Sequence, residues 1–131
     1  MKSYAHDQHF TLADARRTLM EIMPELSRIV ELKRKLESKG FDIHKHQYFG
    51  GMGPNGQKVF PSELEELVET ARAIDRRGVV IKSIELGLID FPHLRSNGEE
   101  VYLCYRVGEA GIASWHTLHE GFAGRQSLDN L

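Results

Sequence analysis

The segment VYLCYRVGEAGIASWHTLHEGFAGRQ, from Val101 to Gln126, decides the fold class of this chain. Its first seven residues alternate in the way that a strand with one apolar face does. That apolar face comprises Val101, Leu103, Tyr105 and Val107. The opposite face comprises Tyr102, Cys104 and Arg106. We therefore predict a strand over residues 101–107 whose apolar face packs against helices.

Weaker strand signals flank this segment. Residues 79–84 and 88–91 are apolar or β-branched and are separated by a short turn, and a fourth strand is expected at residues 113–116, after a glycine-containing loop. Residues 121–126 have two glycines and are expected to form a turn. The pattern predicts a small antiparallel sheet of three or four strands, with its C-terminal turn, over about residues 79–126.

Two helices are predicted before the sheet. The first follows Thr11, a good N-cap, and its apolar residues recur every three or four positions. They are Leu12, Ala15, Leu19, Ile22, Leu26, Ile29 and Leu36. Pro24 lies inside this seam and should kink the helix, because proline lacks the backbone N–H group. The second helix should begin at Ser62, which would form a capping box with Glu65, and end near Arg77.

The fold class that follows is α+β: a long antiparallel helical hairpin, kinked at Pro24, packed on the small sheet. The hairpin spans about residues 11–77 and includes a glycine-rich stretch, about residues 41–60, expected to be a flexible loop. The 131 residues, 40% of them hydrophobic, are expected to form a single domain, 1–131. A single cysteine and no long apolar segment favour a cytoplasmic protein and exclude a membrane helix.

The polar residues of the last third form the candidate site. An acid, a histidine and two guanidinium groups could bind a small anionic ligand and move a proton. The candidate residues are Asp90, Arg106, His116, Glu120 and Arg125. The alternative is that they are ion pairs that lock the sheet to its C-terminal turn, with Arg106 or Arg125 as the partner of Asp90.

Metal binding and nucleophilic catalysis have weaker support in the sequence. His116, His119 and Glu120 would share one face of a helix, but a zinc site needs further ligands, so no metal is predicted. Cys104 lies in an apolar strand, where a buried thiol is usually inert.

Several motifs together resemble one family of prokaryotic proteins. The motifs are GLIDFP at residues 87–92, VYLCYRVGE at 101–109, WH at 115–116 and GFAGRQ at 121–126. The opening FTL at residues 10–12 and MPEL at 23–26 also match. The family is catalogued as domain of unknown function 2203. Because it has no established activity, the resemblance implies a shared fold and assigns neither a reaction nor a cofactor.

The function expected from the sequence is binding without catalysis by a homodimer, because a small sheet could leave part of the two helical seams exposed. A small-molecule binding protein or an enzyme that uses the Asp/Arg/His/Glu site is the alternative. Nucleic-acid binding is the least favoured class, since the net charge is −2 and acids interleave with the cations of residues 28–45.

Overall fold

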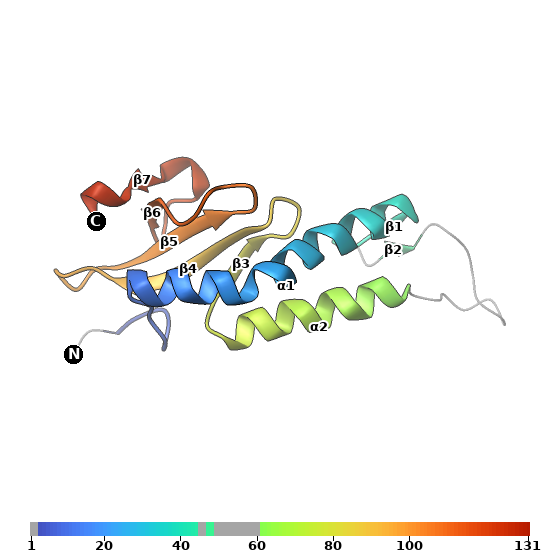
Figure 1. Cartoon of the computed structure of the whole chain (residues 1–131), viewed down its shortest axis with the longest axis horizontal. Coiled ribbons are helices and arrows are strands. Elements are labelled where there is room, and N and C mark those ends of the chain that lie inside the picture. Colours follow the sequence, from blue (N-terminus) through green and yellow to red (C-terminus); the bar gives the residue numbers. More distant parts are fainter. Residues whose placement is uncertain (1–2, 45–46, 49–60) are drawn as a thin grey trace.

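The computed structural model describes residues 3–44, 47–48 and 61–131. Two long helices lie against one antiparallel sheet, so the α+β class is confirmed (Figure 1). The helices are α1 (Leu12–Ser38) and α2 (Ser62–Arg76). The strands are β1 (Phe41–Asp42), β2 (Gln47–Tyr48), β3 (Val80–Ser83), β4 (Leu88–Leu94), β5 (Glu100–Arg106), β6 (Ser114–Thr117) and β7 (Gln126–Ser127). Short 3₁₀ helices cover Phe122–Gly124 and Leu128–Asn130. Within the described residues, no helix is long and apolar enough to cross a membrane.

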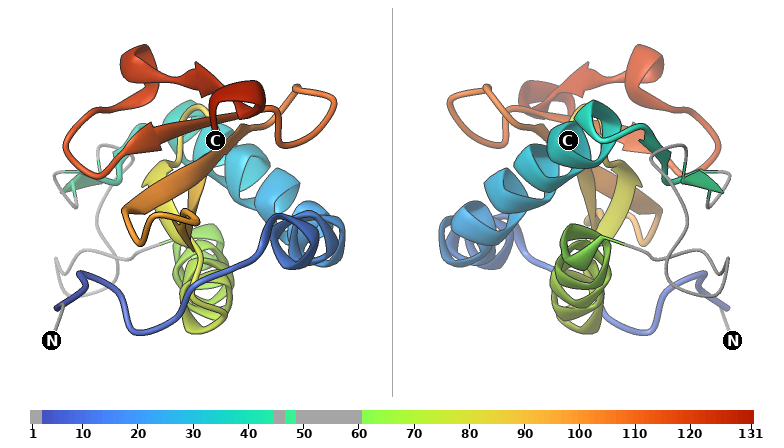
Figure 2. Two further views of the ribbon diagram at one scale, coloured as in Figure 1. Left: turned by 90° about the vertical axis from the view of Figure 1, so that its left-hand side faces the viewer. Right: turned by 90° about the vertical axis from the view of Figure 1, so that its right-hand side faces the viewer.

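Helix α1 begins as its sequence predicts. The hydroxyl oxygen of Thr11 accepts a hydrogen bond from the Asp14 backbone N–H at 3.0 Å, which satisfies one free donor of the first turn. The helix continues without a break through Pro24, and its ribbon changes direction part-way along (Figures 1 and 2). Nearly all of the predicted apolar seam is buried, with Leu12 as the half-buried exception.

Helix α2 differs from its prediction at the first turn. Its N-cap is Pro61 and no side chain caps it, so the expected capping box of Ser62 with Glu65 is wrong; Ser62 is already the first helical residue. Only Leu67 and Ile74 of this helix are buried. One side of α2 packs against α1, and most of its apolar stripe remains half-exposed.

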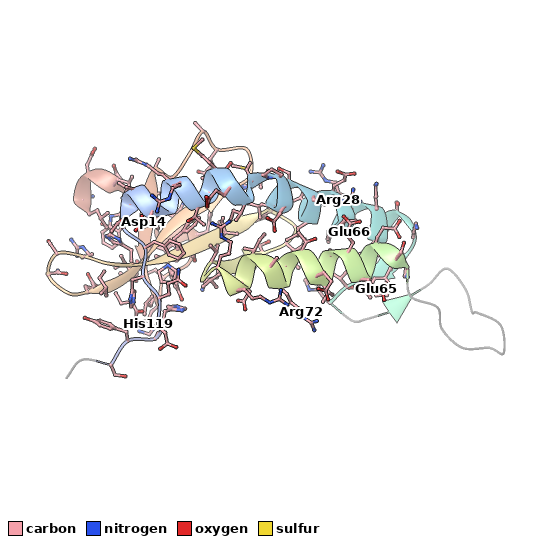
Figure 3. All side chains as sticks on the ribbon, turned by 60° about the horizontal axis from the view of Figure 1, so that its bottom comes forward. Asp14, Arg28, Glu65, Glu66, Arg72 and His119 are labelled. Carbon is pink, nitrogen blue, oxygen red and sulfur yellow. The ribbon has the colours of Figure 1, made fainter. Side chains whose placement is uncertain are left out.

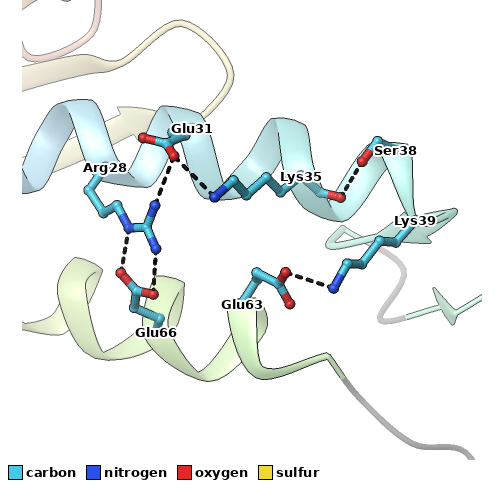
Figure 4. Close-up of polar contacts among 7 residues, drawn as sticks. All are labelled: Arg28, Glu31, Lys35, Ser38, Lys39, Glu63 and Glu66. Carbon is cyan, nitrogen blue, oxygen red and sulfur yellow. Dashed lines mark hydrogen bonds and ion pairs between the residues drawn. The ribbon is translucent and has the colours of Figure 1, made fainter.

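Ion pairs fasten the two helices together (Figure 4). The Arg28 guanidinium donates to both carboxylate oxygens of Glu66, at 2.5 and 2.8 Å, and Lys39 lies 2.7 Å from Glu63. The side chains of the Arg28–Glu66 pair are more than a third exposed, so the pair orients the helices and contributes little to stability.

The sheet has five antiparallel strands in the order β3-β4-β5-β6-β7, which corrects the expected three or four. The fifth strand, β7, lies partly within the predicted C-terminal turn and pairs with β6. The indole N–H of Trp115 donates to the Ser127 carbonyl at 3.1 Å and ties this strand to the core. A tightly packed turn between β3 and β4 depends on Gly87, whose φ is +62° and where a Cβ atom would lie 2.8 Å from Cβ of Val107.

Two apolar clusters lie under the helices. The larger joins α1 to one face of the sheet and includes Ile22, Leu26, Phe91, Leu103 and Trp115, all at most 3% exposed. The smaller comprises Leu32, Leu36, Phe41 and Leu67, at the end of the hairpin that extends past the sheet (Figure 1).

The predicted flexible loop at about residues 41–60 is only partly within the described residues. Its beginning contains the two-stranded ladder β1–β2, in which Phe41 pairs with Tyr48, where no strand was predicted. Burial of Phe41 against the hairpin supplies the apolar contact that holds β1. The remainder of that prediction, residues 45–46 and 49–60, lies outside the described residues.

Candidate functional site

Strand register brings three chemically reactive side chains together on the sheet face opposite α1. Asp90 of β4 pairs directly with Cys104 of β5, and Tyr102 of β5 pairs with His116 of β6. Because side chains alternate along a strand, Asp90, Cys104 and His116 share one face, while their neighbours Ile89, Leu103 and Trp115 face α1. The side chains of Asp90 and His116 are 1% and 3% exposed, and Cys104 is also buried. We call these three residues the buried triad.

The polar atoms of the buried triad lie close to one another. Nε2 of His116 lies 3.0 Å from Oδ2 of Asp90, and Nδ1 lies 2.8 Å from the Thr117 carbonyl oxygen. One ligating atom from each triad residue lies within 4.8 Å of the other two. Burial alone would lower the pKa of His116, but hydrogen bonds with Asp90, Cys104 and the Thr117 carbonyl raise it to about 10. These hydrogen bonds therefore favour the imidazolium form of His116.

Two further features of Asp90 matter for its chemistry. Its second oxygen, Oδ1, is buried and has no hydrogen-bond partner among the described residues. The ammonium group of Lys82 lies 4.0 Å from Oδ2, and its side chain is 37% exposed. Lys82 also lies over the ring of Tyr102, 4.4 Å from the centroid. One oxygen of Asp90, Oδ2, thus has a hydrogen-bond partner, and the other, Oδ1, has none among the described residues. The partly exposed ammonium group of Lys82 lies at the edge of the triad, near Oδ2.

The segment before α1 continues this polar face toward the N-terminus. His6 Nε2 lies 2.6 Å from the Tyr102 hydroxyl, and the Glu100 carboxylate accepts hydrogen bonds from the backbone N–H groups of Ala5 and His6 at 2.7 and 3.0 Å. Nε2 of His9 is 2.8 Å from the same carboxylate. Burial tends to raise the pKa of Glu100, but these donors lower it overall. Glu100 thereby fixes the segment before α1, in which Ala5, His6 and His9 belong to no helix or strand.

Glu100→Gln is expected to destabilise the protein by about 1–3 kcal/mol at neutral pH, because hydrogen bonds to a charged acceptor are lost. The pKa of Glu100 is lower when folded than when unfolded, so its stabilisation is complete above about pH 4.5 and is lost as the pH falls through the folded value. Urea unfolding of both proteins at pH 7 and pH 3 measures this. An equal difference in stability at the two pH values would contradict the assignment.

The other predicted site residues lie around the C-terminal turn. Nη1 of Arg125 is 2.8 Å from a carboxylate oxygen of Glu109, and its guanidinium lies 3.9 Å from the ring centroid of Phe122. The guanidinium of Arg106 is 5.9 Å from the same ring. The carboxylate of Glu120 accepts from the Thr117 hydroxyl at 2.9 Å. The Arg125–Glu109 pair joins the C-terminal turn to the β5–β6 hairpin.

Of the five predicted residues, the structure brings Asp90 and His116 into direct contact. The partner of Asp90 is His116, with Lys82 nearby, which corrects the expectation of an arginine partner. Five hollows on the described surface are lined by residues outside this set. An anion site built from all five residues remains a prediction.

The proposed helical spacing of His116, His119 and Glu120 is wrong. His116 lies in strand β6, and His119 is exposed beyond the end of that strand (Figure 3). Sequence reasoning also missed Cys104 and Lys82 as neighbours of Asp90. Alternation along the two strands is compatible with Cys104 and Asp90 on the same face of the sheet. Only the register between β4 and β5 places them directly opposite each other.

Comparison with family models identifies residues 8–128 with the uncharacterized conserved protein family DUF2203. The chain belongs to this family. The match covers both helices, the sheet and the buried triad, so the resemblance inferred from its motifs is confirmed. Comparison with curated proteins and with solved structures gave no significant match. Membership of DUF2203 does not assign an activity to the chain.

Proposed function

We propose that this DUF2203 protein acts as a homodimer that binds a partner and catalyses no reaction, and that the two copies meet through helix α2. The surface concerned, which we call the α2 face, consists of half-buried apolar residues and exposed charged residues of α2. Its apolar members are Leu64, Val68 and Ala71, and its charged members are Glu65, Glu69, Arg72 and Arg76. The observation that carries the proposal is a half-buried apolar groove flanked by exposed charges, acidic toward the start of α2 and basic toward its end.

The apolar part of the α2 face continues beyond the helix onto β3 and the turn that follows it. Leu64, Val68 and Ala71 are half-buried and line a groove of about 460 Å³ together with side chains of β3 and of the turn after it. The adjoining residues Ile81 and Ile84 are also half-buried. Contiguous apolar surface of this kind usually marks an interaction site. A helix laid into such a groove would bury its apolar stripe.

The charges on α2 favour a second copy of the same chain as the occupant. Glu65 and Glu69 lie toward the start of the helix, and Arg72 and Arg76 toward its end. Glu65 and Arg72 both extend away from α1 (Figure 3). When two α2 helices cross antiparallel about a two-fold axis near Ala71, Glu65 of one copy faces Arg76 of the other and Glu69 faces Arg72. Such an isologous contact is the commonest form of homodimer.

Two features support binding without catalysis. The side chains of Asp90 and His116, which carry the most reactive pair of groups on the sheet, are at most 3% exposed and offer a substrate almost no surface. The α2 face, in contrast, has exposed charged side chains beside its apolar groove. This contrast supports association between surfaces as the activity of the protein.

Charge reversal tests the proposed dimer. Glu65→Arg with Glu69→Arg makes the α2 face positive, and Arg72→Glu with Arg76→Glu makes it negative. Each variant alone is expected to be monomeric in sedimentation velocity, because like charges then face each other, while the native chain is dimeric. An equimolar mixture of the two variants should form a heterodimer, since opposite charges are restored.

Glu99→Arg with Asp129→Arg is the matched control for Glu65→Arg with Glu69→Arg, because it makes the same change in net charge at exposed positions far from α2 in the sequence. This variant should remain dimeric. A native chain that stays monomeric at all concentrations, or a mixture that fails to associate, would overturn the proposal.

A further inference from the structure

We propose that the buried triad is a binding site for a divalent metal ion, with Zn²⁺ as the best chemical fit. The ligands are a carboxylate of Asp90, the thiolate of Cys104 and Nε2 of His116. This proposal rests on the sheet face opposite α1 and is independent of the α2 face.

The donor set matches zinc chemistry. Zn²⁺ in proteins takes sulfur, imidazole nitrogen and carboxylate oxygen in tetrahedral geometry. The three ligating atoms already lie within 4.8 Å of one another, so only small side-chain movements are needed to place an ion between them. If Asp90 uses both of its oxygens, the triad provides four donor atoms.

The hydrogen bonding of His116 favours a ligand at Nε2. Nδ1 lies 2.8 Å from the Thr117 carbonyl oxygen, which can only accept, so Nδ1 carries a proton. In the neutral ring this leaves Nε2 as an acceptor, 3.0 Å from Oδ2 of Asp90. At 3.0 Å, Nε2 of His116 and Oδ2 of Asp90 therefore share either a proton, which makes the ring an imidazolium, or a metal ion. A carbonyl bound to the other ring nitrogen is the usual support of a metal-ligating histidine.

The unsatisfied oxygen of Asp90 favours the metal over the proton. Oδ1 is buried and has no hydrogen-bond partner among the described residues, and such an atom costs free energy unless something binds it. A proton on Nε2 satisfies only Oδ2. A metal ion bound by both oxygens would satisfy the whole carboxylate.

The strands around the triad hold its ligands in place, and Lys82 is the side chain that a metal ion would displace. Asp90, Cys104 and His116 lie on three adjacent strands, so the hydrogen-bonded backbone holds the ligands in position. Lys82 is the cation at the rim, and its side chain is 37% exposed on a flexible stem. Its ammonium group can move into solvent when a metal replaces it beside Asp90.

Cobalt spectroscopy tests the site directly. Protein freed of metal with a chelator is titrated with Co²⁺ and then with Zn²⁺. We expect one Co²⁺ per chain, tetrahedral visible bands and a thiolate-to-cobalt charge-transfer band, all removed by Zn²⁺. In Cys104→Ser the charge-transfer band should disappear, and Zn²⁺ affinity should fall by at least about 100-fold, the upper end of the loss caused by removing a supporting residue.

Two further variants make the test specific. Lys82→Ala removes a competing cation and should tighten Zn²⁺ binding, which a purely structural triad would not show. His119→Ala should leave the cobalt spectrum unchanged, since that side chain is exposed and outside the triad. Folding of every variant is checked by circular dichroism. A folded native protein without a charge-transfer band, or a band that persists in Cys104→Ser, would overturn the proposal.

Discussion

Phe91→Ala is expected to lower the free energy of unfolding by about 3–5 kcal/mol, the usual cost of removing a buried aromatic ring. Phe91 is fully buried in β4, where it belongs to the cluster that joins the sheet to α1. Its ring also makes an edge-on contact with Phe10, with centroids 5.4 Å apart. The cavity left by alanine would therefore loosen both the helix and the segment before it. Urea unfolding measures the change.

Met20→Ala is the control for this experiment. Met20 lies on α1 and is 80% exposed, so its truncation should change stability by less than about 0.5 kcal/mol. Comparable losses in the two variants would mean that α1 does not pack on the sheet as described.

The second large effect is expected at the buried triad. In metal-free protein, Asp90→Ala should destabilise the fold by about 3–5 kcal/mol, because it leaves the buried His116 without its charge partner. Lys82→Ala removes a partly exposed charge 4.0 Å from the same carboxylate and should cost less than about 1 kcal/mol. Chemical unfolding in the presence of a chelator compares the two.

A double-mutant cycle distinguishes a coupled pair from two independent contacts. Asp90→Leu combined with His116→Leu should cost clearly less than the sum of the single changes, since no unpaired charge remains. Additive losses would show that Asp90 and His116 do not interact across the sheet.

Local periodicity predicted the main elements correctly. The three- and four-residue spacing of apolar side chains located α1, and alternation within residues 101–107 located β5 and identified the face that packs on α1. These signals are strong because burial of one face imposes them on each element separately. The start of α2 at Ser62 was predicted correctly, but its capping box was wrong and the strand β7, which has only two residues, was missed.

The candidate site was only partly predictable. Asp90 and His116 were both predicted as members of the candidate site, but Arg106 and Arg125 were expected as partners of Asp90 where His116 and Lys82 are found. Side-chain type shows what a residue can bind, and it contains no information about which strand becomes its neighbour. Cys104 was expected to be buried in an apolar strand, and it is buried.

The sequence by itself determined the α+β class, the DUF2203 family and the face of β5 that packs on α1, because each can be recognised from local patterns and short motifs along the chain. Only the tertiary structure decided that Asp90, Cys104 and His116 meet. They belong to three strands, and their contact depends on the register of two ladders and on the burial of the sheet face opposite α1. Register is a property of paired strands, so no single segment of the sequence can specify it.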